Sequence, residues 1–222
     1  MHSDMLHHSV LLQEVVEALG PTDGQFYLDA TFGNGGYSRA LLERADCCVV
    51  AIDRDPDAIR RGIAMQQEFA GRFVLVEGCF SDMASLIKNL PAGPKMLRGC
   101  APEKLDGAAF DLGVCSTQLD QANRGFSFRF DGPLDMRMSK SGASAADIVM
   151  HSDASDLAQI LWAYGEETAS RRIARAIVTA RETTPITSTT QLADIIYSVM
   201  PSKKPGQIDP ATRSFQALRI YV

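Results

Sequence analysis

The sequence predicts an α/β fold, in which a parallel sheet in the first half of the chain is followed by a mostly helical second half. Three observations predict it. Apolar runs typical of buried strands alternate with stretches of helical periodicity up to about residue 119. Each strand is separated from the next by a segment long enough for a helical crossover, which makes neighbouring strands parallel. Beyond residue 119, helix-like segments continue without a further convincing strand.

The elements of the first half follow in a regular order. A helix is expected over residues 10–19, where apolar side chains recur at helical spacing before glycine and proline interrupt them. Four strands are expected, over residues 25–31, 47–53, 72–78 and 105–113. Helices are expected between them, over residues 37–45, 55–70 and 81–90. The second of these has a clear start signal, with Asp55 as its cap and Pro56 at its first position.

The second half begins with an irregular segment, residues 124–142, that is rich in glycine, arginine and aspartate. Helices are then expected over residues 155–165, 166–182, 189–200 and 211–222. The last of these reaches the end of the chain without a cap or a polar tail, and a four-stranded sheet would leave an apolar edge strand uncovered. We therefore expect that a C-terminal part of the fold is missing.

Composition limits the class of protein. The chain has 222 residues, 45% of them hydrophobic, which is enough for one sizeable core or two small ones without disulfides or a structural metal. The cysteines form no C-x-x-C pair, are odd in number and sit mostly in apolar runs, so reduced, buried thiols in a cytoplasmic protein are expected. They are Cys47, Cys48, Cys79, Cys100 and Cys115. Neither a membrane span nor a signal peptide is apparent, and the four histidines show no metal-ligand spacing.

The net charge of −5 is unevenly distributed. Residues 1–119 carry 10 basic against 16 acidic side chains, whereas residues 120–222 carry 12 against 11, so contact with a polyanion is expected mainly in the second half. Within the helix predicted there, Arg171, Arg172 and Arg175 fall in a sector of about 100°, opposite the apolar side chains. This face is a candidate for contact with RNA phosphates, with Lys203 and Lys204 as further candidates; the alternative is a merely solvated face.

A glycine-rich loop follows the first predicted strand and precedes a helix. Gly33, Gly35 and Gly36 lie where the backbone turns sharply and can approach a ligand. The third glycine of the dinucleotide fingerprint is replaced by Ser38, and no lysine-bearing phosphate loop is present, which argues against a nucleoside triphosphate. Asp53, twenty positions after Gly33 at the end of the second strand, is placed to accept hydrogen bonds from the hydroxyls of a ribose.

Three further features follow predicted strands and should meet at the same edge of the sheet. Asp29 follows the first strand, Phe80 and its neighbours the third, and Asp111 the fourth. Phe80 offers an apolar face to adenine, and either Asp29 or Asp111 offers a carboxylate to an amino-acid ammonium. Together with Asp53 these groups suit S-adenosylmethionine better than NAD. The alternatives are that the glycine loop is only a turn and that Phe80 belongs to the core.

Several motifs together resemble the bacterial RsmH (MraW) family, which methylates N4 of a cytidine in small-subunit (16S) ribosomal RNA. They occupy residues 29–42, 51–59, 110–120, 124–138, 164–167, 171–178 and 211–220. The resemblance implies S-adenosylmethionine as cofactor and a Rossmann-like methyltransferase domain whose N-terminal part is residues 1–119. It further implies an inserted helical substrate-recognition domain at residues 120–208 and a return helix at 209–222, with the remainder of the sheet missing.

The resemblance also implies the residues of the site. The cofactor contacts would be Gly33, Gly35, Gly36, Tyr37, Asp53, Phe80, Asp111 and Gln118. The chain departs from the family pattern at two places: Tyr37 stands where the family often has histidine, and Ser116-Thr117-Gln118 stands where Ser-Pro-Gln is usual.

Cytosine N4 is a poor nucleophile, because its lone pair is delocalised into the ring. An oxygen that accepts a hydrogen bond from N4 would oppose the positive charge that forms during methyl transfer. Asp111 is the first candidate for this role and Ser116 the second; the alternative for Asp111 is a cap of the following turn. A target base taken out of structured RNA also needs a stacking surface, for which the alternating Phe126, Phe128 and Phe130 are candidates, although core burial is the alternative for them.

Arg124, Asp135 and Arg137 are predicted to border the nucleotide site, so they join Phe126 and the arginines of the basic helix as candidate substrate contacts. The leading functional prediction is an RNA cytosine-N4 methyltransferase of the cytoplasm that acts on small-subunit ribosomal RNA, without a metal or a membrane partner and with a homodimer possible. The alternative is a catalytically impaired ribosome assembly factor that binds the cofactor and RNA. A small-molecule or protein methyltransferase is disfavoured by the motifs.

Overall fold

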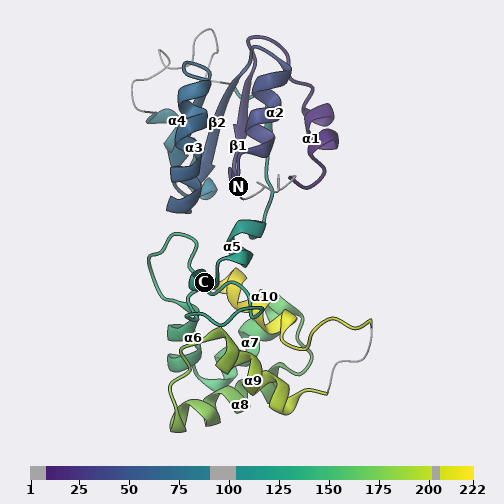
Figure 1. The fold of residues 1–222 in the computed structure, drawn as a ribbon, viewed down its shortest axis with the longest axis vertical. Helices are drawn as coiled ribbons and strands as arrows, with labels where there is room; N and C mark the ends of the chain where they lie inside the picture. The colour runs from purple at the N-terminus through teal and green to yellow at the C-terminus, as the bar shows by residue number, and fades with distance from the viewer. Residues whose placement is uncertain (1–8, 91–103, 202–205) are drawn as a thin grey trace, which may run out of the picture. The chain divides into compact units, whose positions relative to one another are not determined.

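The computed structural model describes residues 9–90, 104–201 and 206–222 (Figure 1). The chain divides into two compact units, Met1–Cys115 and Ser116–Val222.

The first unit contains a four-stranded sheet with the order β3-β2-β1-β4. Its strands are β1 (Phe26–Asp29), β2 (Cys48–Asp53), β3 (Phe73–Glu77) and β4 (Gly107–Ala109). All three strand pairs are parallel, which confirms the prediction. The fourth strand is shorter than the apolar run predicted, and the residues after Ala109, Asp111 among them, lie beyond its end. The carboxyl ends of β1, β2, β3 and β4 therefore share one edge, where the predicted cofactor residues follow them.

Helices cover both faces of this sheet. One face packs against α1 (Leu12–Leu19), α2 (Gly36–Arg44) and α3 (Pro56–Glu68), and the other against α4 (Met83–Lys88). Alternation along β1 explains the two layers, because Tyr27 belongs to the first core cluster, whereas Phe26 and Leu28 belong to the second. The predicted start of α3 is confirmed: the Asp55 carboxylate accepts a hydrogen bond of 2.9 Å from the Asp57 N–H.

The cysteine prediction needs one correction. Cys47, Cys79 and Cys115 are free, as expected, but Cys48 is disulfide-bonded. Cys47 and Cys48 are neighbours that point to opposite faces of the sheet, so they belong to different core clusters. Spacing along the chain does not reveal which cysteines the fold brings together. Cys100 lies outside the described residues.

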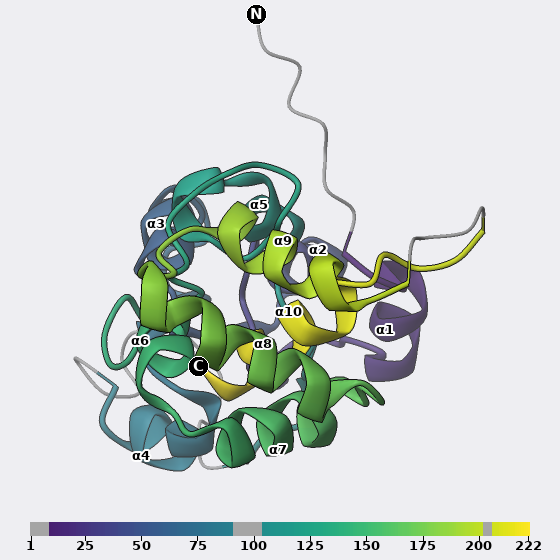
Figure 2. The same ribbon diagram turned by 90° about the horizontal axis from the view of Figure 1, so that it is seen from below.

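The second unit is helical. Its elements are α5 (Ser116–Asp120), the short 3₁₀ turn η3 (Ala122–Arg124), α6 (Ala145–His151), α7 (Ala154–Gly165), α8 (Ser170–Thr183), α9 (Thr189–Val199) and α10 (Thr212–Tyr221). Helix α8 lies between α7 and α9, and α10 packs on α7 (Figure 2). In the described part of this unit no strand forms, only an isolated bridge between Pro133 and Ser188. That residues 209–222 return to the first domain stays a prediction.

Helix α6 was not predicted from the sequence. It is short, and its start is fixed by a capping box in which Ser144 and Asp147 exchange side-chain and backbone hydrogen bonds. The irregular segment before it is held tightly, because a side chain at Gly125, where φ is +67°, would overlap the carbonyl of Pro133. No helix among the described residues has the length and apolar character needed to cross a membrane.

Candidate functional site

The glycine loop joins β1 to α2 through backbone conformations that favour glycine. Gly33 and Gly35 have φ of +55° and +78°. A Cβ at Gly35 would meet the Phe32 ring, and one at Gly36 would overlap the hydroxyl of Ser9. The loop therefore presents bare backbone at the carboxyl end of β1, and the first turn of α2 presents backbone N–H groups there.

Asp53 is fixed by the backbone around it. Its Oδ2 accepts a hydrogen bond of 2.7 Å from the Gly33 N–H, and its Oδ1 accepts one of 2.8 Å from the Asp55 N–H. Burial raises the pKa of the Asp53 carboxyl, and these two hydrogen bonds oppose that rise. Each carboxylate oxygen retains a lone pair, so the group can accept further hydrogen bonds from two neighbouring hydroxyls of one ligand.

Asp29 is turned into the protein interior. It is fully buried and accepts hydrogen bonds from the Ser38 hydroxyl at 2.7 Å and from the Thr31 N–H at 3.3 Å. Burial raises the pKa of Asp29 to about 6. Of the two carboxylates considered for an amino-acid ammonium, Asp29 has no exposed surface to offer. Its role is to fasten the start of α2 to the end of β1.

Asp111, in contrast, is exposed just beyond β4. Its N–H donates a hydrogen bond of 2.8 Å to the Thr31 hydroxyl, and its Oδ2 lies 3.4 Å from the Tyr37 hydroxyl. The one hydroxyl proton of Tyr37 is directed to the shorter contact, the carbonyl of Val10 at 2.5 Å. Burial and the Asp111 carboxylate raise the pKa of Tyr37. Asp111 is thus held between the ends of β1 and α2 with its carboxylate open to a ligand.

Two aromatic rings stand at the ends of β3 and β4. Phe80 is 38% exposed and Phe110 is 46% exposed, and their rings meet edge to face with centroids 6.0 Å apart. The alternative that Phe80 belongs to the core is therefore wrong. Phe110 was missed by the sequence analysis, although its place one residue before Asp111 could have indicated it.

Ser116 and Gln118 lie on α5, in the second unit. Ser116 is exposed, and Gln118 is buried and has an interaction partner. Their roles in catalysis and cofactor contact stay predictions.

The irregular segment of the second unit corrects two predicted substrate contacts. Arg124 is buried, and its Nη2 donates hydrogen bonds to the carbonyls of Arg137 and Met138 at 3.0 and 3.1 Å. Phe126 is fully buried beneath the Arg124 guanidinium, which lies 5.3 Å from the ring centroid. The structure gives neither side chain an exposed surface for a nucleotide, because both hold this segment together. Alternation along the chain places Phe126 on an apolar face but does not distinguish a core from a stacking surface.

The other aromatic residues of this segment differ from Phe126. Phe128 packs edge to face on Phe215 with centroids 4.9 Å apart, whereas Phe130 is 56% exposed. Asp135 and Arg137 form a bidentate ion pair, with Oδ2 to Nη2 and Oδ1 to Nε distances of 2.6 and 3.0 Å, and the guanidinium lowers the pKa of Asp135. Their binding of substrate stays a prediction.

The basic face of α8 forms as predicted. Arg171, Arg172 and Arg175 are exposed, and Ile173 and Ile177 are buried on the opposite side. Within the described ranges no carboxylate pairs with these arginines. Their contact with phosphates stays a prediction.

Lys203 and Lys204 lie outside the described residues. Over the part of the chain that is described, no group of three or more His, Cys, Asp or Glu side chains is arranged to hold a metal ion.

Comparison with known families identifies the chain. The model of the MraW methylase family matches residues 4–222. This chain belongs to the MraW methylase family. The resemblance noted in the sequence motifs is thereby confirmed, together with the α/β fold class.

Curated relatives are similar over nearly all of this MraW-family chain. A protein of Parvibaculum lavamentivorans is 54% identical over 216 residues, which are 97% of this chain and 61% of the relative. Proteins of Rhodospirillum rubrum and Gluconobacter oxydans are 55% and 56% identical, again over 97% of this chain and 63% of each relative. All three are named ribosomal RNA small subunit methyltransferase H. The chain spans about three fifths of the length of these relatives.

The first unit of this MraW-family chain fits S-adenosylmethionine, the methyl donor that the sequence analysis predicted. The glycine loop presents backbone without side chains at this edge, and Asp53 is oriented to accept from a ribose. Phe80 offers an exposed ring for adenine, and Asp111 an exposed carboxylate for the ammonium. The groups of this edge therefore suit the ribose, the adenine face and the ammonium of that molecule.

Proposed function

We propose that this chain binds S-adenosylmethionine at the carboxyl edge of its sheet and contributes to methylation of N4 of a cytidine in small-subunit (16S) ribosomal RNA. In this proposal residues 1–119 form the N-terminal part of the methyltransferase domain. Residues 120–208 form the substrate-recognition insertion, and residues 209–222 return to the first domain. The protein would act in the cytoplasm, with ribosomal RNA as its partner.

One observation carries the proposal. Asp53 is oriented by two backbone N–H donors, one of which comes from the glycine loop twenty positions earlier. A carboxylate that served only to cap a turn would not need to be tied to a loop of bare backbone at the end of a neighbouring strand. The names of the relatives support RNA as the methyl acceptor.

Bound S-adenosylmethionine would supply an electrophilic methyl group on its sulfonium sulfur. The protein's own contribution is positioning and charge stabilisation. In this proposal the Asp111 carboxylate accepts a hydrogen bond from the N4 amino group, which localises the nitrogen lone pair and opposes the positive charge that forms as the methyl arrives. The Thr31 hydroxyl holds the backbone of Asp111 in place by accepting a hydrogen bond from its N–H.

Exposure refines the assignment of substrate residues. Phe130, rather than Phe126, has a ring on which an extruded base can stack. Arg171, Arg172 and Arg175 are exposed cations on one face of α8 and suit RNA phosphates.

The proposal is tested in two stages with the full chain. Isothermal titration calorimetry with S-adenosylmethionine should show one binding site per chain; no heat of binding would overturn the cofactor site. Incubation with methyl-labelled S-adenosylmethionine and unmodified small ribosomal subunits should then transfer label to cytidine N4, identified by nucleoside mass spectrometry. Binding of the cofactor and RNA without label in the RNA would instead support the assembly factor that the sequence analysis kept as its alternative.

A further inference from the structure

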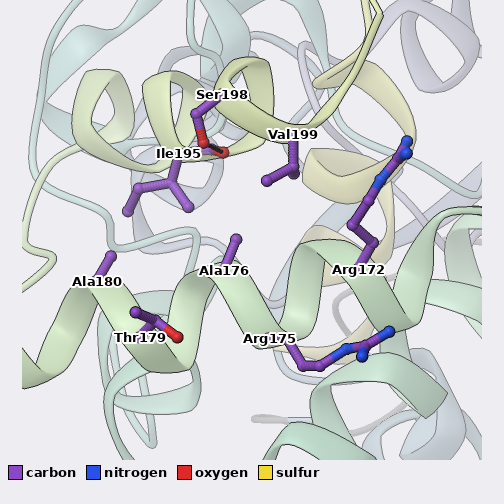
Figure 3. Close-up of a pocket in the computed structure, with 8 residues that line it drawn as sticks. All are labelled: Arg172, Arg175, Ala176, Thr179, Ala180, Ile195, Ser198 and Val199. Carbon is purple, nitrogen blue, oxygen red and sulfur yellow. Dashed lines mark hydrogen bonds between the residues drawn. The ribbon is translucent and has the colours of Figure 1, made fainter.

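Helices α8 and α9 do not close completely against each other, and a groove of about 500 Å³ remains between them (Figure 3). Volumes of about 300–1,000 Å³ are typical of small-molecule sites. From α8 the groove is lined by Arg172, Arg175, Ala176, Thr179 and Ala180, and from α9 by Ile195, Ser198 and Val199. Short alanine side chains on α8 leave this space, because they stop short of the branched side chains that face them from α9 (Figure 3).

The groove has apolar walls and two arginines among its lining residues. Figure 3 shows the side chains of Ala176, Ile195 and Val199 pointing into the space between the helices, with Arg172 extending past Val199 and Arg175 extending along the side of α8 that faces away from α9. None of its lining residues is acidic. The groove therefore combines uncompensated positive charge with a surface suited to a planar, weakly polar group.

The two arginines are held at the groove by neutral partners. Arg172 donates from Nη2 to the Met200 sulfur at 3.4 Å, and Arg175 donates from Nε to the Arg171 carbonyl at 3.1 Å. Neither contact neutralises a guanidinium, and each leaves further N–H donors unused. Both side chains are therefore partly ordered before an anion binds. Less side-chain conformational entropy is then lost when it does.

We propose that this groove holds one unpaired nucleotide of the RNA, with its base between the apolar walls and its two flanking phosphates on Arg172 and Arg175, one on each. The proposal rests on the proposed function, and it names a contact outside the cofactor edge and outside the exposed Phe130. Single-stranded RNA offers base faces and phosphates together, whereas a duplex keeps its base faces stacked inside. An acidic peptide would satisfy the arginines but would leave the apolar walls without a planar partner.

Fluorescence anisotropy with a labelled ten-nucleotide single-stranded RNA, titrated with the full chain at several salt concentrations, tests the proposal. The double variant R172Q/R175Q should weaken binding about tenfold and reduce the slope of log affinity against log salt by about 1.4, since each phosphate contact on a single strand contributes about 0.7. Ala176→Leu, which fills the groove and keeps both charges, should weaken binding about fivefold with an unchanged salt slope.

Matched controls separate the groove from charge and helix effects. Arg44→Gln removes one exposed charge from α2 in the first unit, and Ala163→Leu enlarges an exposed alanine on α7; both should leave RNA affinity unchanged. If Ala176→Leu binds RNA as the unchanged chain does, no base enters the groove and the proposal is overturned. Equal binding of a duplex of the same sequence, or displacement of the RNA by an equimolar oligoglutamate peptide, would overturn it as well.

Cofactor binding distinguishes this proposal from the proposed function. Both groove variants should bind S-adenosylmethionine, measured by calorimetry, as the unchanged chain does. An unchanged chain that binds single-stranded RNA through the groove but takes up no cofactor would overturn the proposed function alone. A chain that binds cofactor but is insensitive to the groove variants would overturn the groove alone.

Discussion

The Gly33 N–H donates a hydrogen bond of 2.7 Å to Oδ2 of Asp53 and so ties the glycine loop after β1 to the end of β2. The backbone adds a second link between the same strands, because the Phe32 N–H donates to the Ile52 carbonyl at 2.9 Å. The loop geometry and the carboxylate orientation are therefore one unit. A change in the loop or in the Asp53 carboxylate should therefore weaken the binding of any ligand that contacts both.

Replacement of Asp53 tests this unit directly. Asp53→Ala leaves the N–H groups of Gly33 and Asp55 without their acceptor, so the free energy of unfolding should fall by about 1–3 kcal/mol. Affinity for S-adenosylmethionine, measured by calorimetry at a temperature where the variant is folded, should fall at least about tenfold. Asp53→Asn keeps one acceptor oxygen and should lie between the two proteins in both measurements. An affinity unchanged in Asp53→Ala would remove the ribose assignment.

Gly35 is a second test, because its conformation and its surroundings both exclude a side chain. Gly35→Ala places a Cβ against the Phe32 ring at a residue with φ of +78°. Gly142 is the matched control, since it has φ of +84° and open space around it, so Gly142→Ala suffers backbone strain alone. In urea unfolding, Gly35→Ala should lose about 1–2 kcal/mol more than Gly142→Ala. Equal losses would show that the loop yields to the added methyl.

The buried Asp29 predicts a specific pH dependence of stability. Its pKa in the folded protein, about 6, lies above the value of about 3.9 expected for an unfolded chain. Between about pH 4 and pH 6 the folded state therefore binds more protons, so this carboxyl stabilises the fold less as the pH rises through that window. Asp29→Asn does not titrate and is the reference. The unfolding free energy of the unchanged chain, measured relative to that of Asp29→Asn, should fall by about 1–3 kcal/mol from pH 4 to pH 7.

Ser38 supplies the control for that measurement. Its hydroxyl donates to the Asp29 carboxylate and lowers the pKa that burial raises. In Ser38→Ala the carboxyl resonance of Asp29, followed by NMR, should titrate at a higher pH than in the unchanged chain. A midpoint near 4 in the unchanged chain would contradict the burial of this carboxyl.

The features of this site that depend on residues close together in the sequence could be predicted, and those that depend on packing could not. The strands, the glycine loop and the cap of α3 by Asp55 rest on short patterns, and the structure confirms them. Whether Asp29 or Asp111 offers its carboxylate to the ammonium depends on which of them is exposed. Their positions at strand ends do not indicate this in the sequence. Hydrogen bonds from the Ser38 hydroxyl and the Thr31 N–H hold the Asp29 carboxylate inside the fold.

The second unit shows the same limit more strongly. The alternation of Phe126, Phe128 and Phe130 predicts one face of an extended segment, but each ring meets a different environment. Arg124 folds back over Phe126 to bond two carbonyls of the same segment. Residue type alone does not distinguish an arginine that donates to backbone carbonyls from one that faces solvent. For this reason Arg124 was predicted to contact the substrate.

Cys79 follows β3 and is predicted to be more reactive than Cys47, another of the free thiols. Hydrogen bonds from Ser81 lower the pKa of Cys79, whereas burial raises the pKa of Cys47. Iodoacetamide at pH 7.5 should therefore label Cys79 well before Cys47, as read by peptide mass spectrometry. Ser81→Ala should slow the labelling of Cys79. S-adenosylmethionine should also slow it, because Cys79 adjoins Phe80; equal rates with and without cofactor would argue against Phe80 as the adenine contact.

Phe126 and Phe130 allow effects on stability to be separated from effects on RNA binding. They are phenylalanines four positions apart, of which the first is buried and the second exposed. Phe126→Ala empties a fully buried site and should lower the free energy of unfolding by about 3–5 kcal/mol. Phe130→Ala should change stability by no more than about 0.5 kcal/mol, yet it should weaken binding of single-stranded RNA by about 1–3 kcal/mol if a base stacks on the ring. Phe130→Tyr, which keeps the ring, should restore that affinity. If folded Phe130→Ala binds RNA with unchanged affinity, no base stacks on this ring. The exposed RNA contacts proposed for the described part of this unit would then be those of α8 and its groove.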